Sequence, residues 1–234
     1  MISFVVPAYN EERLVGRTLE ALHDAARATA EPYELVVVDD GSVDETAAIA
    51  DANGARVVRV QFRHIARTRN AGAHAAVGET LIFVDADTIV PAATVRATIE
   101  ALRQGAEGGG ATVYVDGHLP LWAWLLLPVF RSILRAGGLA AGCYVYCSRD
   151  AFDAVGGFDE QLYAAEEIAF SRTLRQKGRV VILRESVTTS GRKLRAHSGW
   201  EVLRLAVALM RQGTGLVRSR DHLSIWYGDR HDDV

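Results

Sequence analysis

Two carboxylates separated by one alanine, Asp85 and Asp87, follow a short apolar run at residues 80–84. A run this short, rich in β-favouring residues and without polar alternation, is typical of a strand buried on both faces of a parallel sheet. Open α/β sheets bind ligands at the carboxyl ends of their strands, so we expect both aspartates to face a ligand. Carboxylate oxygens suit Mg²⁺ or Mn²⁺, which bind through one or two carboxylates together with substrate phosphates. The pattern predicts a cation and phosphate site, with a solvated turn as the alternative interpretation.

Two further polar groups follow predicted strands. Pro7-Ala8-Tyr9-Asn10-Glu11 comes after the first strand, and Asp39-Asp40-Gly41-Ser42 comes after the second. Because the carboxyl ends of parallel strands open on the same edge of a sheet, we expect these groups to share one cleft with Asp85 and Asp87. Such a cleft suits a nucleoside diphosphate: the base could stack on or near Tyr9, an acid could accept from a base N–H, and a cation could offset the phosphates.

An alternation of strands and helices would bring these groups together. Repeated strand–helix units connect through right-handed crossovers and form a parallel sheet. In the first predicted helix, apolar residues recur at i, i+4, i+7 and i+11, which gives that helix one buried face. Strands are predicted at 2–6, 35–38, 56–60 and 80–84, and helices from residues 11, 42, 65 and 91.

Local signals place the ends of these elements. Asn10 is expected to cap the first helix, and Ser42 with Glu45 has the capping-box spacing for the second. Pro91 is placed to open the fourth helix. Pro7 is expected to end the first strand.

The second half of the chain is less regular. Pro128 is expected to break an apolar segment at 119–134, and residues 156–160 form a turn-rich loop. Cys143 and Cys147 are expected to be small core residues, because no matching histidine pair accompanies them. The remaining predictions are strands at 112–115, 143–147 and 179–183 and helices at 165–177 and 200–211.

The composition limits the class of protein. The 234 residues, 49% of them hydrophobic and 24% charged, suffice for one sizeable core. The net charge of -3 gives no electrostatic case for nucleic-acid binding. No Gly-x-Gly-x-x-Gly follows the first strand and no Gly-Lys-Ser/Thr loop occurs, which argues against dehydrogenases and P-loop enzymes. Two cysteines are too few for a disulfide framework and no secretory signal opens the chain, so we expect a cytoplasmic protein.

The longest apolar run, residues 119–130, is twelve residues long. A helix that spans a membrane needs about 20 such residues, so the run does not predict an ordinary transmembrane segment. It is expected to be either a buried helix or a helix that lies in a membrane interface.

Five segments, taken in order, resemble family 2 glycosyltransferases. They are Val-Val-Pro-Ala-Tyr-Asn-Glu-Glu at 5–12, Val-Val-Asp-Asp-Gly-Ser-Val-Asp at 37–44, Arg-Asn-Ala-Gly at 69–72, Gly-Glu-Thr-Leu-Ile-Phe-Val-Asp-Ala-Asp at 78–87 and Gly-Gly-Phe-Asp-Glu at 156–160. The resemblance covers roughly residues 2–183. It implies sugar transfer with inversion from a nucleotide-sugar donor, assisted by Mn²⁺ or Mg²⁺, on a GT-A fold. This fold is a Rossmann-like α/β architecture whose mostly parallel sheet is flanked by helices.

The resemblance also implies roles for individual residues. Asp40, or its neighbour Asp39, would pair with the base, and Arg69 would lie near the nucleotide. Asp85 would face the ribose and take part in the metal site, in which Asp87 would hold the cation. The other residues expected to line the nucleotide pocket are Pro7, Ala8, Tyr9, Glu11 and Ala86. The alternative, purely structural roles are a turn for Asp39-Asp40 and a surface ion pair for Arg69.

The sequence departs from the family at the catalytic base. Many members carry Glu-Asp at a helix start after the Gly-Gly-Phe-Asp-Glu loop, and the second acid is the base; here Glu166 and Glu167 stand in these places. We expect Glu167 to be the base, with Glu166 as the alternative. His197 is a candidate for completing the metal shell. The Gln-x-x-Arg-Trp signature of processive members is absent, so a single transfer is expected.

These features together predict one domain over residues 1–234. It would have a nucleotide-binding half at 1–105, an acceptor-side half at 106–198 and a C-terminal helix and tail at 199–234. A UDP-sugar donor is favoured over a GDP-sugar, and the sugar, acceptor and oligomeric state stay open. One alternative function is transfer to a polyprenyl phosphate at the inner face of a membrane, which residues 119–130 would contact. Another is a non-catalytic nucleotide-sugar-binding protein.

Overall fold

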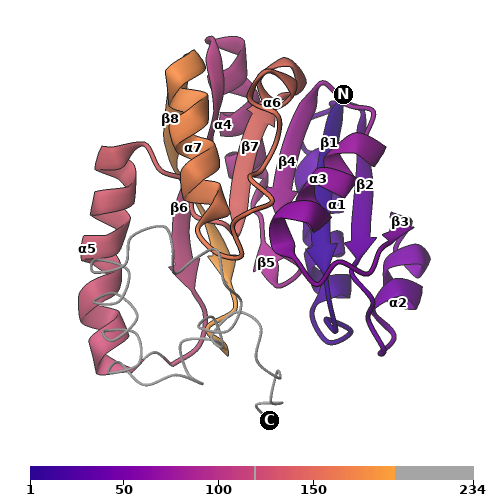
Figure 1. Cartoon of the computed structure of the whole chain (residues 1–234). Helices are drawn as coiled ribbons and strands as arrows, with labels where there is room; N and C mark the ends of the chain where they lie inside the picture. The colour runs from indigo at the N-terminus through magenta and orange to yellow at the C-terminus, as the bar shows by residue number, and fades with distance from the viewer. Residues whose placement is uncertain (119, 193–234) are drawn as a thin grey trace.

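The computed structural model describes residues 1–118 and 120–192 and shows a single eight-stranded sheet flanked by helices (Figure 1). The strand order is β3-β2-β1-β4-β7-β6-β8-β5. The α/β prediction is therefore confirmed. The predicted helix at 200–211 and His197 lie outside the described residues.

The first half of the chain forms the parallel part of the sheet. Its strands are β1 (Ile2–Ala8), β2 (Tyr33–Asp39), β3 (Arg56–Arg59) and β4 (Thr80–Val84), and every neighbouring pair among them is parallel. Their connecting helices are α1 (Val15–Arg27), α2 (Thr46–Ala52) and α3 (Ile65–Ala75). As expected for strands with both faces covered, the strand residues Phe4, Val5, Val36 and Val37 are fully buried.

The second half makes the sheet mixed. The strand β7 (Tyr144–Ser148) is antiparallel to both β4 and β6 (Ala106–Val115), whereas β8 (Arg179–Thr189) is parallel to β6. The two-residue strand β5 (Thr88–Ile89) pairs with the end of β8, so the chain just after β4 meets the chain at residues 188–189. The helices of this half are α4 (Ala92–Arg103), α5 (Leu121–Gly137), α6 (Arg149–Val155) and α7 (Glu166–Lys177).

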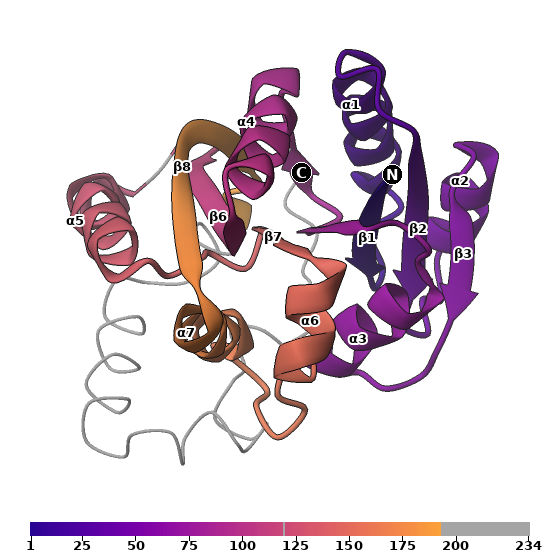
Figure 2. The same cartoon turned by 90° about the horizontal axis from the view of Figure 1, so that it is seen from above.

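Helices cover both faces of the sheet, and α5 lies to one side of it (Figure 2). The face that carries α1 and α4 has its own core, which includes Leu19 and Val95. The opposite face, covered by α3, α6 and α7, holds a cluster of aromatic rings. In that cluster the ring of Phe158 lies 4.9 Å from that of Phe83 on β4 and 4.3 Å from that of Phe170 on α7. Phe158 thus ties the loop at 156–160 and the start of α7 to the strand that precedes Asp85.

Several predicted boundaries of helices and strands are wrong, because tertiary contacts outweigh the local signals. Pro7 does not end β1; it lies inside the strand and pairs with Val38. Asn10 does not cap α1, which begins at Val15; its side-chain oxygen accepts a hydrogen bond from the backbone of Val43 instead. The capping box is also absent, since α2 begins at Thr46 after an N-cap at Glu45 that makes no side-chain cap bond.

The strand predicted at 112–115 begins at Ala106, because three glycines continue it rather than break it. A Cβ atom on Gly109 would stand 1.8 Å from the carbonyl oxygen of Val181, and one on Gly108 would stand 2.4 Å from that of Tyr146. Neighbouring backbone approaches so closely that only glycine fits. A glycine run that indicates a loop is, in this sheet, a requirement for strand packing.

Pro128 does not break the apolar segment, since α5 runs without interruption from Leu121 to Gly137. Proline removes the N–H that would bind the carbonyl four residues earlier, here that of Trp124. Pro128 lies on an exposed side of α5, where water can bind this carbonyl. None of the helices in the described ranges combines the length and apolar character that crossing a membrane requires.

Candidate active site

The acid pair lies in a tight turn at the carboxyl end of β4. The backbone N–H of Asp85 donates to the carbonyl of Cys143, and the N–H of Thr88 donates back to the Asp85 carbonyl at 3.0 Å. From the other side, the Thr18 hydroxyl on α1 donates to the carbonyl of buried Ala86 at 2.9 Å. The residue just before β7 and a hydroxyl of helix α1 therefore hold the turn between them.

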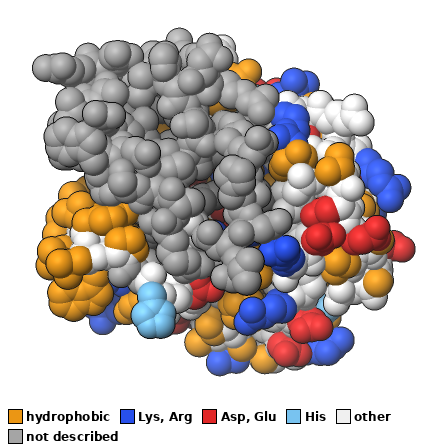
Figure 3. Space-filling model, turned by 90° about the horizontal axis from the view of Figure 1, so that it is seen from below, with side chains coloured by type: hydrophobic (Ala, Val, Ile, Leu, Met, Phe, Trp, Pro, Cys, Tyr) orange, Lys and Arg blue, Asp and Glu red, His pale blue; other side chains and the backbone are white. Residues whose placement is uncertain are grey.

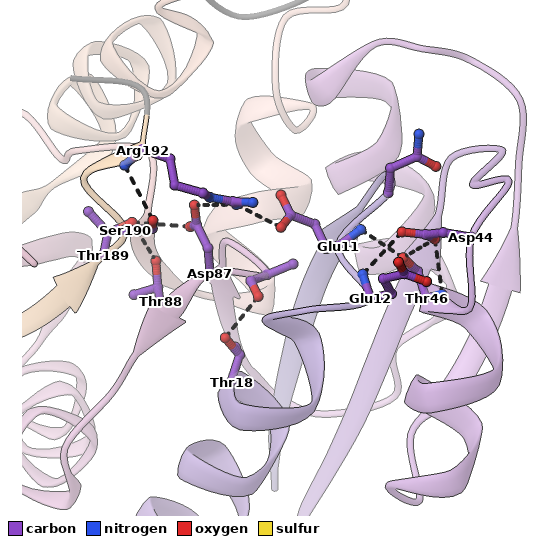
Figure 4. Close-up of polar contacts among 12 residues, drawn as sticks. Glu11, Glu12, Thr18, Asp44, Thr46, Asp87, Thr88, Thr189, Ser190 and Arg192 are labelled. Carbon is purple, nitrogen blue, oxygen red and sulfur yellow. Dashed lines mark hydrogen bonds and ion pairs between the residues drawn. The ribbon is translucent and has the colours of Figure 1, made fainter. Parts of the chain in front are cut away.

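Asp87 belongs to a group of side chains that converges from three parts of the chain (Figure 4). One carboxylate oxygen accepts from the Thr189 hydroxyl at 3.1 Å. The other accepts from a guanidinium nitrogen of Arg192 at 3.2 Å, and the same nitrogen donates to Glu11 at 2.7 Å. Glu11 and Asp87 consequently flank one position that a single cationic atom fills.

This position suits a divalent cation in its donor chemistry. Both flanking groups are carboxylates, and one atom can lie within contact distance of oxygens from each. In the part of the chain that the structure describes, no cluster of three or more His, Cys, Asp or Glu side chains could hold a metal. Mg²⁺ usually binds through only one or two carboxylates and takes the rest of its ligands from water and substrate phosphates. The predicted third ligand, His197, lies outside the described residues.

Asp85 belongs to a second, more buried network. Its carboxylate accepts from Arg69 at 3.0 Å, and the other terminal nitrogen of Arg69 donates to Glu166. Arg69 also donates to the carbonyl of Gly142 at 2.7 Å. Only 2% of the Arg69 side chain is exposed, so the surface ion pair considered as an alternative is wrong. Burial alone would lower the pKa of Arg69, but Glu166 and Asp85 outweigh it and raise this pKa, which keeps the guanidinium charged.

Glu167 stands beside this network, but in the described part of the chain Arg69 forms its ion pairs with Asp85 and Glu166 and not with Glu167. A Cβ atom placed on Gly142 would lie 3.3 Å from Arg69 and 3.5 Å from the Glu167 carboxyl, so all three groups meet there. Burial, followed by the charge of Glu166, raises the pKa of Glu167 to about 8, although Arg69 opposes this shift. Glu166 is 4% exposed and held by Arg69, whereas Glu167 is only partly buried. Of the two glutamates, Glu167 is the one able to reach a ligand.

The two acids after β2 have different surroundings. Asp40 accepts four hydrogen bonds, at 2.5 to 3.1 Å, from the backbone of residues 62–64 and the hydroxyl of Thr68. Both of its oxygens are thus used to hold the start of α3. Asp39 accepts from the backbone N–H of Ser42 through one oxygen, Oδ1. Asp39 and Asp40, which the sequence left as alternatives, therefore differ in how far hydrogen bonds from the protein occupy their carboxylates.

The other predicted residues of the nucleotide pocket lie at the ends of β1 and β4. Pro7 and Ala8 are the last residues of β1, which places them beside β2 and its Asp39. The guanidinium carbon of Arg63 lies 3.2 Å from the centre of the Tyr9 ring, so one face of this ring is already covered. Cys143 and Cys147 are free and buried, as predicted. Burial raises the pKa of both thiols, which keeps them protonated and unsuited to bind a metal.

The candidate site residue that the sequence interpretation missed is Arg192, which contacts both Glu11 and Asp87. It lies just beyond β8, and it reaches Glu11 across 181 positions of sequence. The available signal was a basic residue after Ser190-Gly191 at a strand end, which by itself indicates a turn.

Comparison with known proteins agrees with this geometry. The chain matches Glycosyl transferase family 2 over residues 3–177. It is 32% identical over 157 residues to an undecaprenyl-phosphate 4-deoxy-4-formamido-L-arabinose transferase of Pseudomonas aeruginosa (strain LESB58), which covers 62% of this chain and 44% of that protein. It is 29% identical over 167 residues to a dolichol-phosphate mannosyltransferase of Pyrococcus furiosus, which covers 67% of this chain and 45% of that protein. The chain thus spans less than half the length of these relatives.

Solved structures share the fold. The mannosyltransferase PcManGT of Pyrobaculum calidifontis, in complex with GDP-Man and Mn²⁺, has a TM-score of 0.66 at 19% identity, over 93% of this chain and 62% of that one. Residues 1–349 of TarS from S. aureus, in complex with UDP-GlcNAc, give a TM-score of 0.65 at 21% identity, over 98% and 72% of the two chains. These similarities confirm the predicted GT-A fold. With the strand-end acids in place and a family match from residue 3 to residue 177, the chain belongs to glycosyl transferase family 2.

Proposed function

We propose that this chain carries the catalytic site of an inverting, metal-dependent, non-processive glycosyltransferase that uses a UDP-sugar or, as the second choice, a GDP-sugar. The observation that carries the proposal is the position of the Asp85-Ala86-Asp87 turn. On one side of it two carboxylates flank a cation position, and on the other side lies a carboxyl group with a raised pKa. A donor diphosphate and a general base are needed on opposite sides of a reacting sugar. PcManGT with GDP-Man and TarS with UDP-GlcNAc support a nucleotide-sugar donor.

On the donor side, Asp87 and Glu11 would hold Mn²⁺ or Mg²⁺. The ion would offset the charge that develops on the leaving diphosphate. We assign the contact with the base N–H to Asp39 rather than Asp40, because four protein donors already occupy the Asp40 carboxylate. Arg69 acts on this side only indirectly, by holding Asp85 in place.

On the acceptor side, Glu167 would take the proton of an acceptor hydroxyl. The acceptor oxygen then attacks the anomeric carbon as the bond from that carbon to the nucleotide diphosphate breaks, and the configuration inverts. An acceptor that is already an anion, such as a phosphate, needs no such base. The role of Glu167 therefore depends on the chemistry of the acceptor.

The donor site is tested by calorimetric titration of UDP-sugars and GDP-sugars, with Mn²⁺ and with chelator. We expect binding that depends on the metal, and we expect Asp87→Asn to abolish this dependence while the protein remains folded. Equal affinity with and without metal would contradict the proposal. Metal-dependent binding without transfer or donor hydrolysis would instead support the non-catalytic nucleotide-sugar-binding alternative.

The same titration with free UDP or GDP tests the base contact. Asp39→Asn should weaken the free nucleotide as much as the nucleotide sugar, since both contain the base; losing such a partner costs about 1–3 kcal/mol. If the variant binds the free nucleotide as wild type does, Asp39 is a turn residue only.

The second candidate is transfer to a polyprenyl phosphate at a membrane surface, and helix α5 favours it. Figure 3 shows hydrophobic side chains gathered on the side of the molecule where α5 lies. Seven large apolar residues of α5 are more than half exposed: Leu121, Trp124, Leu125, Leu126, Val129, Phe130 and Ile133. A space of about 460 Å³ lies between α5 and β6.

The charge around α5 also fits a membrane surface. No Asp or Glu occurs between Asp116 and Asp150, where Arg131 and Arg135 supply positive charge. An apolar helix with arginines and no acid suits an anionic lipid surface. The undecaprenyl-phosphate and dolichol-phosphate named for the relatives are acceptors of the same class.

Vesicle sedimentation tests this membrane contact. We expect the protein to sediment with vesicles that contain anionic lipid, and Trp124→Gln with Phe130→Gln to release it, because both side chains are exposed on α5. Val77→Gln is the matched control, since Val77 is an exposed apolar residue outside α5. A protein that stays in the supernatant with every vesicle composition would exclude α5 as a membrane contact.

A further inference from the structure

Arg192 occupies the position that a cation would take between Glu11 and Asp87. Its guanidinium nitrogen lies 2.7 Å from the Glu11 oxygen and 3.2 Å from the Asp87 oxygen. The two carboxylates are mostly buried, with 6% and 12% of their side chains exposed. Two such like charges close together would repel strongly without a cation between them. Arg192 supplies that charge, because a single nitrogen of its guanidinium contacts both carboxylates.

The segment before Arg192 is held against the same turn. The backbone N–H of Ser190 donates to the Asp87 carbonyl at 3.2 Å, and the Thr189 hydroxyl donates to the Asp87 carboxylate. Gly191 donates its N–H to Asp116 at 2.8 Å. Figure 4 shows the Arg192 side chain extending from this anchored segment toward Glu11. The backbone fixes where the arginine starts, while 31% of its side chain remains exposed.

We propose that Arg192 is a stand-in for the divalent cation: it neutralises Glu11 and Asp87 before the donor binds, and it is displaced when the metal enters with the donor diphosphate. Only the second part, displacement of Arg192 by the metal and the donor diphosphate, rests on the proposed function. A guanidinium released from two carboxylates can form paired hydrogen bonds to a phosphate, whose oxygens match its planar geometry. Metal without nucleotide must break the Arg192 contacts and offers the arginine no new partner. Metal with nucleotide offers it the diphosphate.

Two consequences follow from this exchange. Mn²⁺ alone should bind weakly to the wild-type protein, because it competes with a positive charge already in place. Mn²⁺ and the nucleoside diphosphate should strengthen one another's binding, and by reciprocity the factor is the same in both directions. Arg192 is therefore a positioning residue that makes metal binding depend on the donor.

Arg192→Gln tests the proposal through Mn²⁺ binding in the absence of nucleotide, measured by calorimetry and by the paramagnetic resonance signal of free Mn²⁺. We expect Mn²⁺ to bind about tenfold more tightly or better, since relief of only about 1.4 kcal/mol of competition gives that factor. Arg192→Lys keeps the charge and should remain close to wild type. Arg103→Gln is the matched control, because it removes an equal charge from an exposed pair with Glu31, away from the strand ends of the site. Unchanged Mn²⁺ affinity in Arg192→Gln would overturn the proposal.

The second measurement uses UDP and uridine with the same variants. In Arg192→Gln, the strengthening of Mn²⁺ binding by UDP should shrink by about the factor gained for Mn²⁺ alone, and uridine affinity should not change. An undiminished coupling would overturn the exchange. If wild type binds no nucleotide but Arg192→Gln still binds Mn²⁺ more tightly, the proposed function fails while the stand-in role of Arg192 survives. If wild type binds UDP with Mn²⁺ and the variant shows no gain for Mn²⁺ alone, the stand-in role of Arg192 fails while the proposed function survives.

Discussion

Glu167→Gln is expected to lower turnover by about 10²–10⁴-fold with an acceptor hydroxyl, while donor affinity stays nearly unchanged. Glutamine keeps the size of the side chain but cannot accept the proton that the hydroxyl loses. Donor affinity should persist because the donor contacts belong to Asp39, Glu11 and Asp87. Steady-state kinetics and calorimetry on the same preparation measure the two quantities. Glu20→Gln, on an exposed position of α1, is the matched control.

The outcome also identifies the acceptor class. With an acceptor phosphate the attacking oxygen is already anionic, so Glu167→Gln should then retain most of its turnover. Full activity with an acceptor hydroxyl would remove Glu167 from the mechanism. Glu166 would not readily take over as the base, because its carboxylate accepts a hydrogen bond from Arg69.

The raised pKa of Glu167 gives the same experiment a dependence on pH. A base must be ionised, so kcat/KM of the wild type should rise with pH through the region near 8, and Glu167→Gln should lose this limb. Stability should move in the opposite direction. Between the ordinary carboxyl pKa of 4.5 and about 8, the folded protein holds a proton that the unfolded chain releases, so the free energy of unfolding falls as pH rises. Glu167→Gln lacks this loss, and thermal unfolding at several pH values would show it.

The second large effect is expected from Arg69→Met, which should lower the free energy of unfolding by about 3–5 kcal/mol at neutral pH. Methionine fills much of the space but leaves Asp85 and buried Glu166 without their shared cation. Urea denaturation measures the loss.

Two further variants show whether the lost charge is the cause. Arg69→Met combined with Glu166→Gln should recover part of the loss, because one of the two unpaired charges is gone. Arg103→Met removes an exposed pair with Glu31 and should cost only about 0–1 kcal/mol. A loss in Arg69→Met no larger than in Arg103→Met would show that the buried network does not stabilise the fold.

The sequence by itself determined the elements that carry the site. Apolar runs at 35–38 and 80–84 predicted β2 and β4, and an amphipathic pattern predicted α1, because periodicity and burial are local properties. The same local order placed Asp39, Asp85 and Asp87 at strand ends, and it placed two glutamates at the start of α7. The ordered motifs sufficed for the family, which the match over residues 3–177 confirmed.

Only the tertiary structure decided which of these groups meet. Strand β7 enters the sheet antiparallel beside β4. With this strand order, Arg69 on α3 reaches Glu166 on α7 across 97 positions of sequence. Strand β5 pairs with the end of β8, which carries Arg192 to Asp87 and Glu11. The distinction between Asp39 and Asp40 depends on where residues 62–64 fold back. Each of these contacts is set by strand order rather than by spacing along the chain, and no local pattern of residue types records that order.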